Sequence, residues 1–566
     1  MKKTKPARTH ALAALLAAAL LAVGAPQVAA AANAAVQVRV DAKAHGTPFP
    51  HFWEEMFGSG RASLTLRDDY RKDLAEAKRI TGFSYVRFHG ILDDDVGLFQ
   101  LGKAGQPFYN AADKSGGDGQ PVYNFSYVDQ IYDGLLERGV RPFVELGFMP
   151  RDLSSDPKAL QDFWYHPNVA PPKDYALWDG MIRAFAQHLV ARYGIDEVSQ
   201  WYFEVWNEPN IGFWAGNPKM ETYYTLYDHT ARALKSVSPR LRVGGPSTAQ
   251  AAEVAGFLRH VHAEDVPLDF VSTHVYGDDT AENVFRTDEN IPRKDMVCRA
   301  VDKVHKEIQA SPYSKLPFFM SEYNASYANL PNVTDTVYMG PWLANTIRAC
   351  AGKVDAMSYW TFSDVFEEGG VVRSPFYGGF GLIAERNIAK PSFNAFAMLH
   401  RLGDVRLPVA SDSAIATRRA DGTVVLALWN YAPPVGDTAA YTVGKPKGEV
   451  RHFEVELSAL PAQATAQVWR LDENHGNVIA TFDRMGRPAF PSREQIEQLR
   501  EAGKLSAPEQ LAVHGGKLGL DIPPQGLVVI EVKCPGRRPC PPPSRRGPGQ
   551  GTACTGTALD RGRPLH

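Results

Sequence analysis

Cysteine and excess charge are both scarce in this chain. Only 5 of its 566 residues are cysteine, and none has the spacing of a zinc site, so neither a disulfide-rich scaffold nor a zinc protein is indicated. Cys298 and Cys350 fall on predicted helices and are expected to be buried small hydrophobes. The others, Cys534, Cys540 and Cys554, lie in the C-terminal tail. The net charge is only −2, so nucleic acid is not an expected partner.

Long apolar runs are also missing, apart from one near the N-terminus. Basic residues within 2–8 precede an apolar stretch at 11–25 and small residues at 28–32, which are the three parts of a secretory signal. A membrane anchor would need roughly 18 or more apolar residues. We therefore predict a signal peptide at 1–32, export to the periplasm or the extracellular space, and no membrane association after cleavage.

The middle of the chain alternates short apolar strands with amphipathic helices. The predicted strands cover residues 49–56, 84–89, 141–147, 200–206, 241–245, 270–276, 316–321 and 355–361. The helices between them cover residues 66–81, 127–138, 175–193, 220–237, 251–263, 294–309 and 334–351. Eight such units predict an α/β fold, a (β/α)₈ TIM barrel over residues 46–403. A doubly wound sheet is the main rival, but no Gly-rich phosphate loop follows an early strand.

After residue 402 the pattern changes to short alternating strands separated by Pro, Gly and Asp turns. These strands cover residues 423–429, 450–457, 467–471 and 526–532, and residues 36–41 show the same alternation. We predict an accessory β-sandwich domain built from residues 36–45 and 404–533. The Pro/Arg/Gly-rich tail at 534–566 has too little apolar surface to pack and is expected to be disordered.

Two carboxylates stand where buried strands end, Glu208 after the fourth predicted strand and Glu322 after the seventh. The active sites of barrel enzymes lie at the carboxyl ends of the strands. Hydrolysis of a glycosidic bond needs two carboxyl groups facing each other across it. A separation of about 5–5.5 Å predicts retention of the anomeric configuration, and about 6.5–9.5 Å predicts inversion.

The neighbours of the two carboxylates suggest how the roles divide. Asn207 can donate a hydrogen bond to a sugar hydroxyl, and aromatic residues such as Trp206 can raise the pKa of Glu208 by desolvation, as a general acid requires. A phenol from Tyr276 can keep Glu322 ionised as a nucleophile. We therefore predict Glu208 as acid/base and Glu322 as nucleophile.

Two further acidic residues lie inside predicted strands and are interpreted as structural. Glu145 is a candidate barrel-interior partner for Arg87. The alternation around Glu204 does not show which face of its strand this residue occupies.

Five segments together resemble glycoside hydrolase family 39, which contains β-xylosidases and α-L-iduronidases. They cover residues 87–90, 206–210, 273–276, 321–324 and 359–368, and the likeness is greatest to bacterial β-xylosidases. The resemblance implies a retaining barrel hydrolase with acid/base Glu208 and nucleophile Glu322. It also implies that substrate is held by His89, Asn207, His274, Tyr276, Trp360, Phe366 and Glu367.

The substrate prediction rests on charge. A pocket for iduronic acid should present cations to the sugar carboxylate, and Arg or Lys is sparse in and near the five segments apart from Arg87 and Arg373. We therefore predict an exo-acting β-D-xylosidase of xylan degradation, releasing xylose from xylooligosaccharides through a covalent intermediate, without metal or cofactor. The alternatives are a family member acting on arabinopyranosides, glucosides or iduronides, and a non-catalytic carbohydrate-binding barrel. The sequence leaves open exo versus endo action and assembly into a homo-oligomer.

Overall fold

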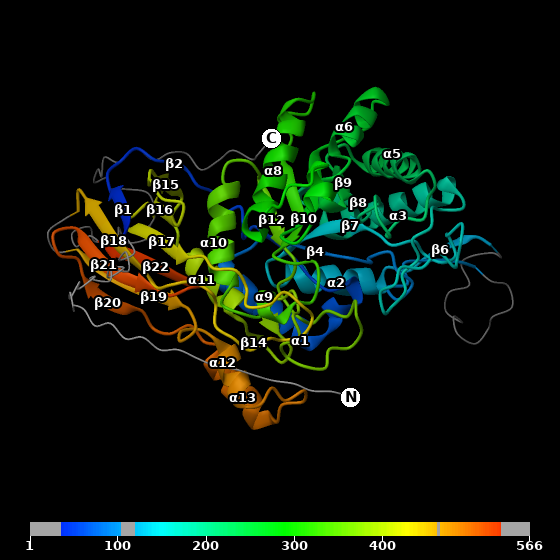
Figure 1. Ribbon diagram of the computed structural model, residues 1–566. Helices are drawn as coiled ribbons and strands as arrows, with labels where there is room; N and C mark the ends of the chain where they lie inside the picture. Colours follow the sequence, from blue (N-terminus) through cyan, green and yellow to red (C-terminus); the bar gives the residue numbers. More distant parts are fainter. Residues whose placement is uncertain (1–34, 103–118, 461–463, 534–566) are drawn as a thin grey trace, which may run out of the picture.

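In the computed structural model, which describes residues 35–102, 119–460 and 464–533, eight parallel strands close into a barrel (Figure 1). The predicted signal peptide, the predicted disordered tail and its three cysteines lie outside these ranges. In barrel order the strands are β3 (Met56–Gly58), β4 (Tyr85–Phe88), β7 (Arg141–Leu146), β8 (Tyr202–Val205), β9 (Arg242–Thr248), β10 (Phe270–Tyr276), β11 (Phe318–Asn324) and β12 (Ala356–Tyr359). The TIM-barrel prediction is confirmed.

A helix follows every barrel strand and covers the outside of the barrel. These helices are α1 (Asp68–Thr81), α2 (Ser126–Leu136), α3 (Tyr175–Tyr193), α5 (Lys219–Val237), α6 (Val254–Ala263), α8 (Arg293–Gln309), α10 (Met339–Cys350) and α11 (Pro391–Leu399). The connections hold η1 (Ala62–Leu66), β5 (Phe99–Leu101), β6 (Pro121–Tyr123), α4 (Ile195–Val198), η2 (Ala249–Ala251), α7 (Ala281–Phe285), α9 (Pro331–Thr334), β13 (Ile383–Ala384) and β14 (Ile388–Ala389). Within the described ranges, no helix has the length and apolarity needed to cross a membrane.

The barrel interior is layered, because side chains alternate between the two faces of each strand. An aromatic layer closes the end where the strands begin, built largely from Phe143, Tyr202, Phe270 and Phe319. Two residues further along three of the strands, a charged layer follows, which contains Arg87, Glu145 and Glu204. Arg87 lies 3.1 Å from Glu145 and 2.6 Å from Glu204. The structural interpretation of both glutamates therefore agrees with the geometry.

The first barrel strand was predicted too early. Residues 49–56 form mostly a turn, and β3 begins only at Met56. Pro50 cannot donate a ladder hydrogen bond, while Phe52 and Trp53 are buried as loop packing. β3 ends at Gly58, which packs against the Trp360 ring. A Cβ atom added at Gly58 would lie 2.1 Å from a carbon of this ring. A side chain at this position would displace Trp360.

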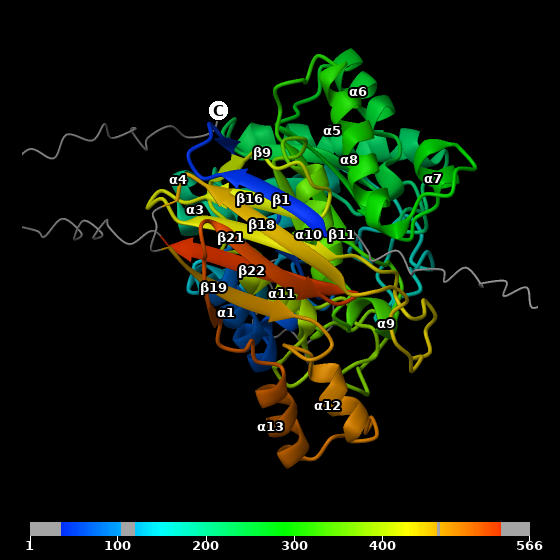
Figure 2. The ribbon, with the colours of Figure 1, turned by 60° about the vertical axis from the view of Figure 1, so that its left-hand side comes forward.

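Two sheets outside the barrel form the accessory sandwich (Figure 2). The smaller sheet holds β1 (Val36–Asp41), β18 (Arg451–Ser458) and β21 (Lys517–Ile522). The larger sheet holds β2 (Thr47–Pro48), β15 (Val405–Leu407), β16 (Ala414–Arg418), β17 (Val424–Asn430), β22 (Gly526–Lys533), β19 (Thr465–Leu471) and β20 (Glu509–Ala512). Val38, Phe453, Leu426 and Ile530 are among the side chains buried between the two sheets.

The outer face of the larger sheet joins the barrel core. Trp429, Leu471 and Val529 belong to the same buried cluster as the residues of α10 and α11. Between β19 and β20 the chain inserts a helical pair, α12 (Val478–Arg484) and α13 (Arg493–Ala502), in a region where only strands were predicted. Phe482 of this pair packs against Phe376 in the loop after β12, with ring centroids 4.9 Å apart.

Cys298 and Cys350 are buried, but they form a disulfide that was not predicted. Their Cα atoms lie 5.0 Å apart although 52 residues separate them along the chain. Cys298 belongs to α8 and Cys350 ends α10, two helices that follow adjacent barrel strands and pack side by side. The two cysteines meet because closure of the barrel places α8 beside α10. Their spacing in the sequence does not predict this disulfide.

Replacing both cysteines with alanine should lower the free energy of unfolding by about 2–4 kcal/mol, because the open loop gains conformational entropy in the unfolded chain. Urea unfolding of the oxidised protein and the double variant measures this difference. Activity should change little, since the bridge joins helices outside the barrel. If dithiothreitol left the unfolding midpoint of the oxidised protein unchanged, the bridge would contribute no stability.

Candidate active site

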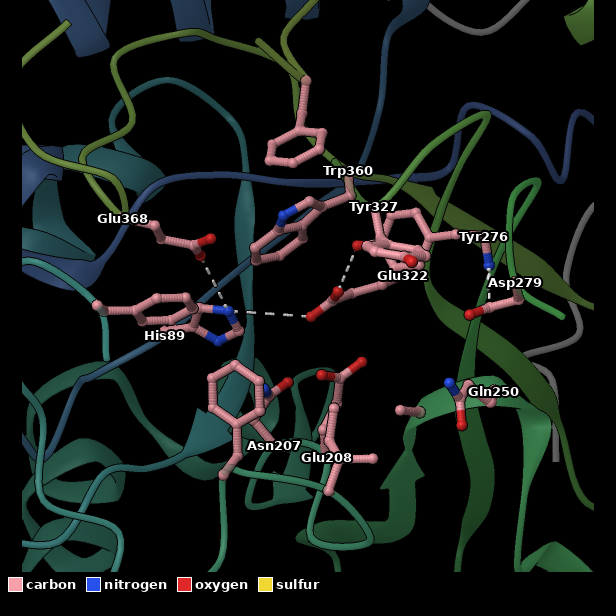
Figure 3. A pocket seen from close by; sticks show the side chains of 15 residues that line it. His89, Asn207, Glu208, Gln250, Tyr276, Asp279, Glu322, Tyr327, Trp360 and Glu368 are labelled. Atoms are coloured by element: carbon pink, nitrogen blue, oxygen red, sulfur yellow. Dashed lines mark hydrogen bonds and ion pairs between the residues drawn. The ribbon is translucent and has the colours of Figure 1, made fainter. Parts of the chain in front are cut away.

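A pocket of about 380 Å³ opens at the carboxyl ends of the barrel strands (Figure 3). Both predicted carboxylates, Glu208 and Glu322, reach it. The described residues that line it are His89, Phe163, Asn207, Glu208, Ile211, Phe213, Ala249, Gln250, Tyr276, Asp279, Glu322, Tyr327, Trp360, Glu368 and Phe380. Its volume lies at the small end of the range for ligand pockets, about 300–1,000 Å³.

Glu208 is presented by a sharp turn just after β8. Trp206 has φ of 71° and Glu208 has φ of 45°, both in the left-handed region that non-glycine residues rarely adopt. The Glu208 backbone N–H donates to the carbonyl of Ser247 at 2.8 Å, and Asn210 exchanges hydrogen bonds with Ala249. The loops after strands four and five are thereby tied together, which holds this strained turn.

Glu322 lies near the end of β11, where the pairing register with β12 shifts between Met320 and Tyr323. Both of its oxygens are held. Arg87 donates to one oxygen at 2.6 Å, and the Tyr276 hydroxyl donates to the other at 2.6 Å. Charge-assisted hydrogen bonds of this kind fix the orientation of the carboxylate and favour its ionised form.

His274 connects the two carboxylates from below the pocket. Its Nδ1 lies 3.0 Å from a Glu208 oxygen and 3.6 Å from a Glu322 oxygen, and oxygens of the two glutamates lie within 4.8 Å of each other. Arg87 donates to the Ser247 hydroxyl at 3.3 Å, and this hydroxyl lies 3.3 Å from His274 Nε2. With the Ser247 hydroxyl donating to Nε2, Nδ1 carries the proton and donates to Glu208.

The electrostatic surroundings separate the two carboxylates. Burial and the nearby Glu322 carboxylate raise the pKa of Glu208 well above its usual range. Burial also raises the pKa of Glu322, but Arg87 and the Tyr276 hydroxyl oppose this rise. Burial and the charge of Arg87 lower the pKa of His274 well below its usual value, so this imidazole is neutral. Such a site can hold one protonated and one ionised carboxyl group, as general acid catalysis with a nucleophile requires.

Comparison with known proteins decides the family. The sequence matches glycosyl hydrolases family 39 over residues 36–516. This chain belongs to glycosyl hydrolase family 39. It is therefore a glycosidase, and the resemblance carried by the five sequence segments is confirmed.

Three relatives within the family span nearly the whole chain. A β-xylosidase of Geobacillus stearothermophilus is 38% identical over 485 residues, which cover 84% of this chain and 90% of that protein. A β-xylosidase of Caldicellulosiruptor saccharolyticus is 34% identical over 496 residues, which cover 85% and 95% respectively. The crystal structure of a monomeric β-xylosidase from Caulobacter crescentus CB15 superimposes with a TM-score of 0.79 at 33% identity, covering 89% of this chain and 100% of that one.

The other residues implied by the family resemblance fall into two groups. His89, Asn207, Tyr276 and Trp360 line the pocket beside the carboxylates. His274 is completely buried and contacts Glu208 rather than the cavity. Phe366 lies behind the wall, where its ring packs edge-on against Trp360 and Phe380.

Glu367 does not line the pocket either, and unlike His274 and Phe366 it contacts neither a catalytic carboxylate nor a lining aromatic ring in the described contacts. It pairs with Arg67 at 2.6 Å, while its neighbour Glu368 lines the pocket 3.5 Å from His89 Nε2. A turn begins at Glu368, and the sequence Glu-Glu does not show which of the two side chains faces the pocket. Burial and the carboxylate of Glu322 raise the pKa of Glu368 well above its usual range.

Replacing Glu368 with Gln should raise KM or lower kcat roughly 10-fold or more, because a polar group that lines the pocket beside His89 would change. Glu367→Gln is the matched control and should keep near-complete activity, since its partner is the half-exposed Arg67. Steady-state kinetics of both variants measure the difference. Equal losses in the two variants would contradict the assignment of Glu368 to the pocket.

Proposed function

We propose that this protein is an exo-acting, retaining β-D-xylosidase that releases xylose from xylooligosaccharides. The carboxylate pair carries the proposal. One oxygen of Glu208 lies within 4.8 Å of one oxygen of Glu322, which supports the separation of about 5–5.5 Å of retaining enzymes rather than about 6.5–9.5 Å. The relatives named β-xylosidases in Geobacillus and Caldicellulosiruptor support xylose as the sugar.

The reaction proceeds in two steps at this pair. Glu322 attacks the anomeric carbon while Glu208 gives its proton to the departing oxygen, which forms a covalent glycosyl–enzyme ester and releases the leaving group. Glu208, now ionised, takes a proton from water as the water oxygen attacks the same carbon and breaks the ester. His274 supports both steps, because its Nδ1–H holds one Glu208 oxygen in place.

The charge of the pocket supports a neutral sugar. None of the described lining residues is Arg or Lys, whereas Glu208, Asp279, Glu322 and Glu368 are all acidic. Arg87 is completely buried beneath the pocket, and its guanidinium is occupied by carboxylates. The carboxylate of an iduronide would have no cation partner here and would be repelled by its surroundings. The small volume supports binding at the end of a chain rather than along it.

Export is part of the proposal. The predicted signal peptide and the disulfide between Cys298 and Cys350 both fit an oxidising compartment such as the periplasm. Fractionation of cells expressing the full chain, with N-terminal sequencing of the product, tests it. A mature N-terminus near residue 33 in the periplasm or the medium is expected. Retention of an uncleaved chain in the cytoplasm would contradict export.

Hydrolysis of a panel of aryl glycosides tests the activity. Aryl β-D-xyloside should be cleaved with the highest kcat/KM, ahead of the α-L-arabinopyranoside, the β-glucoside and the α-L-iduronide. NMR of the first-formed sugar should show β-xylose, as retention requires. Preference for the iduronide would overturn the sugar assignment, and first-formed α-xylose would overturn the retaining mechanism. No cleavage of any member of the panel would favour a carbohydrate-binding barrel.

A further inference from the structure

The pocket has two sides, separated by the carboxylate pair. Figure 3 shows His89 and Glu368 on one side of Glu208 and Glu322, with Gln250 and Asp279 on the other. Trp360, whose ring lies 4.8 Å from that of His89, belongs to the first side. These two rings and the two carboxylates enclose one sugar-sized space. Gln250 and Asp279 have no part in it, and the family resemblance gave them no role.

The second side leads out to solvent past Tyr327. This residue is 57% exposed and is the single largely exposed member of the described pocket lining, whereas His89 and Trp360 are each only 3% exposed. The Tyr327 ring stands edge-on to Tyr276, with centroids 6.4 Å apart. Tyr327 therefore presents an aromatic face to solvent at the edge of the pocket, where a sugar ring can reach it.

Hydrogen bonds hold Tyr327 and Asp279 in place on this side of the pocket. The Tyr327 N–H donates to the Asp278 carboxylate at 3.0 Å, and the Ser326 hydroxyl donates to the same carboxylate at 2.5 Å. Asp279 accepts from the Tyr276 N–H at 2.8 Å, and Gln250 lines the pocket on the same side. A fixed aromatic face with a fixed carboxyl group and an amide is the arrangement that binds a sugar ring by stacking and hydrogen bonds.

We propose that Gln250, Asp279 and Tyr327 form the subsite for the leaving-group sugar. The inference rests on the proposed function, because it assigns the two ends of the glycoside to the two sides of the site. The sugar that becomes esterified to Glu322 occupies the enclosed side. The remainder of the chain leaves through the open side, where its ring stacks on Tyr327 and its hydroxyl groups bind Gln250 and Asp279. Glu208, between the two sides, protonates the oxygen that joins them.

The test compares two substrates that differ only in the leaving group. The leaving group of xylobiose is a second xylose ring. The leaving group of methyl β-D-xyloside is methanol, which is similarly poor but has no ring. Tyr327→Ala and Gln250→Ala should each lower the ratio of kcat/KM for xylobiose to kcat/KM for the methyl xyloside roughly 3- to 10-fold, as expected for one lost stacking or hydrogen-bonding contact. Tyr327→Phe keeps the aromatic face and should restore most of the ratio.

Tyr127→Ala is the matched surface control, because Tyr127 is 48% exposed on α2 and does not line the pocket. Its ratio should equal that of the unaltered protein. The subsite proposal is overturned if Tyr327→Ala and Gln250→Ala leave the ratio unchanged, or if they slow both substrates equally. The aryl glycoside panel tests the xylosidase proposal by itself. If the panel identifies another sugar, the disaccharide and the methyl glycoside of that sugar replace the two xylosides in the subsite test. Failure of the xylosidase proposal is thereby distinguished from failure of the subsite proposal.

Discussion

Replacing Glu322 with Ala should lower kcat/KM for aryl β-xyloside on the order of 10⁵-fold, the lower end of the effective molarities of well-oriented intramolecular groups. The variant keeps Glu208 but has no nucleophile to form the glycosyl ester. Its fold should survive, because Arg87 retains ion pairs with Glu145 and Glu204 inside the barrel. Steady-state kinetics measure the loss, and thermal melting checks the fold.

Added azide distinguishes a lost nucleophile from general damage to the site. The space vacated by the Glu322 side chain admits azide, which attacks the anomeric carbon of a dinitrophenyl β-xyloside and gives the α-xylosyl azide while dinitrophenolate departs. Glu367→Gln is the control, since its carboxylate lies outside the pocket. Activity of Glu322→Ala near that of the unaltered protein would refute the nucleophile assignment.

Replacing Glu208 with Ala should give losses that depend on the leaving group. Hydrolysis of xylobiose should fall about 10²–10⁴-fold, because the departing sugar oxygen needs a proton. Cleavage of a dinitrophenyl xyloside should begin with a rapid burst, since dinitrophenolate leaves without protonation. Turnover should then be slow, because no base activates the water that attacks the ester. Equal losses for both substrates without a burst would contradict the acid/base role.

The pH profile gives a second measure of Glu208. The general acid must be protonated, so kcat/KM for xylobiose should fall as the pH rises through the pKa of Glu208. That pKa lies well above the usual carboxyl range because of burial and the neighbouring Glu322. The basic limb should therefore lie above the usual carboxyl range, and it should disappear in Glu208→Ala assayed with the dinitrophenyl xyloside. A basic limb that persists in this variant would belong to another group.

The catalytic pair was accessible from the sequence because each residue follows a strand. Alternating strands and helices determine a barrel, and a barrel brings the ends of its strands to one mouth. Glu208 and Glu322 could therefore be paired across a sequence separation of 114, and the structure places them in one pocket. Glu145 was a candidate barrel-interior partner of Arg87, and the two side chains lie 3.1 Å apart.

Residues in the loops could not be placed in this way. Glu367 and Glu368 are adjacent and chemically identical, and only the path of the loop after β12 turns Glu368 inward. His274 lies near the end of β10, where the pairing register with β11 shifts, and it contacts Glu208 instead of lining the cavity. Tyr327 follows no periodic pattern, so no local signal marked it as part of the pocket.

The sequence by itself determined the fold class and the two carboxylates, because strand and helix periodicity are local properties of the chain and barrel closure follows from them. The tertiary structure decided the electrostatics of the site and the contacts around it. Arg87 approaches the carboxylates from β4, whereas His274 and Tyr276 approach them from β10, and the Cys298–Cys350 bridge joins two neighbouring helices. Such contacts depend on register and loop path, which are set only when distant segments pack together.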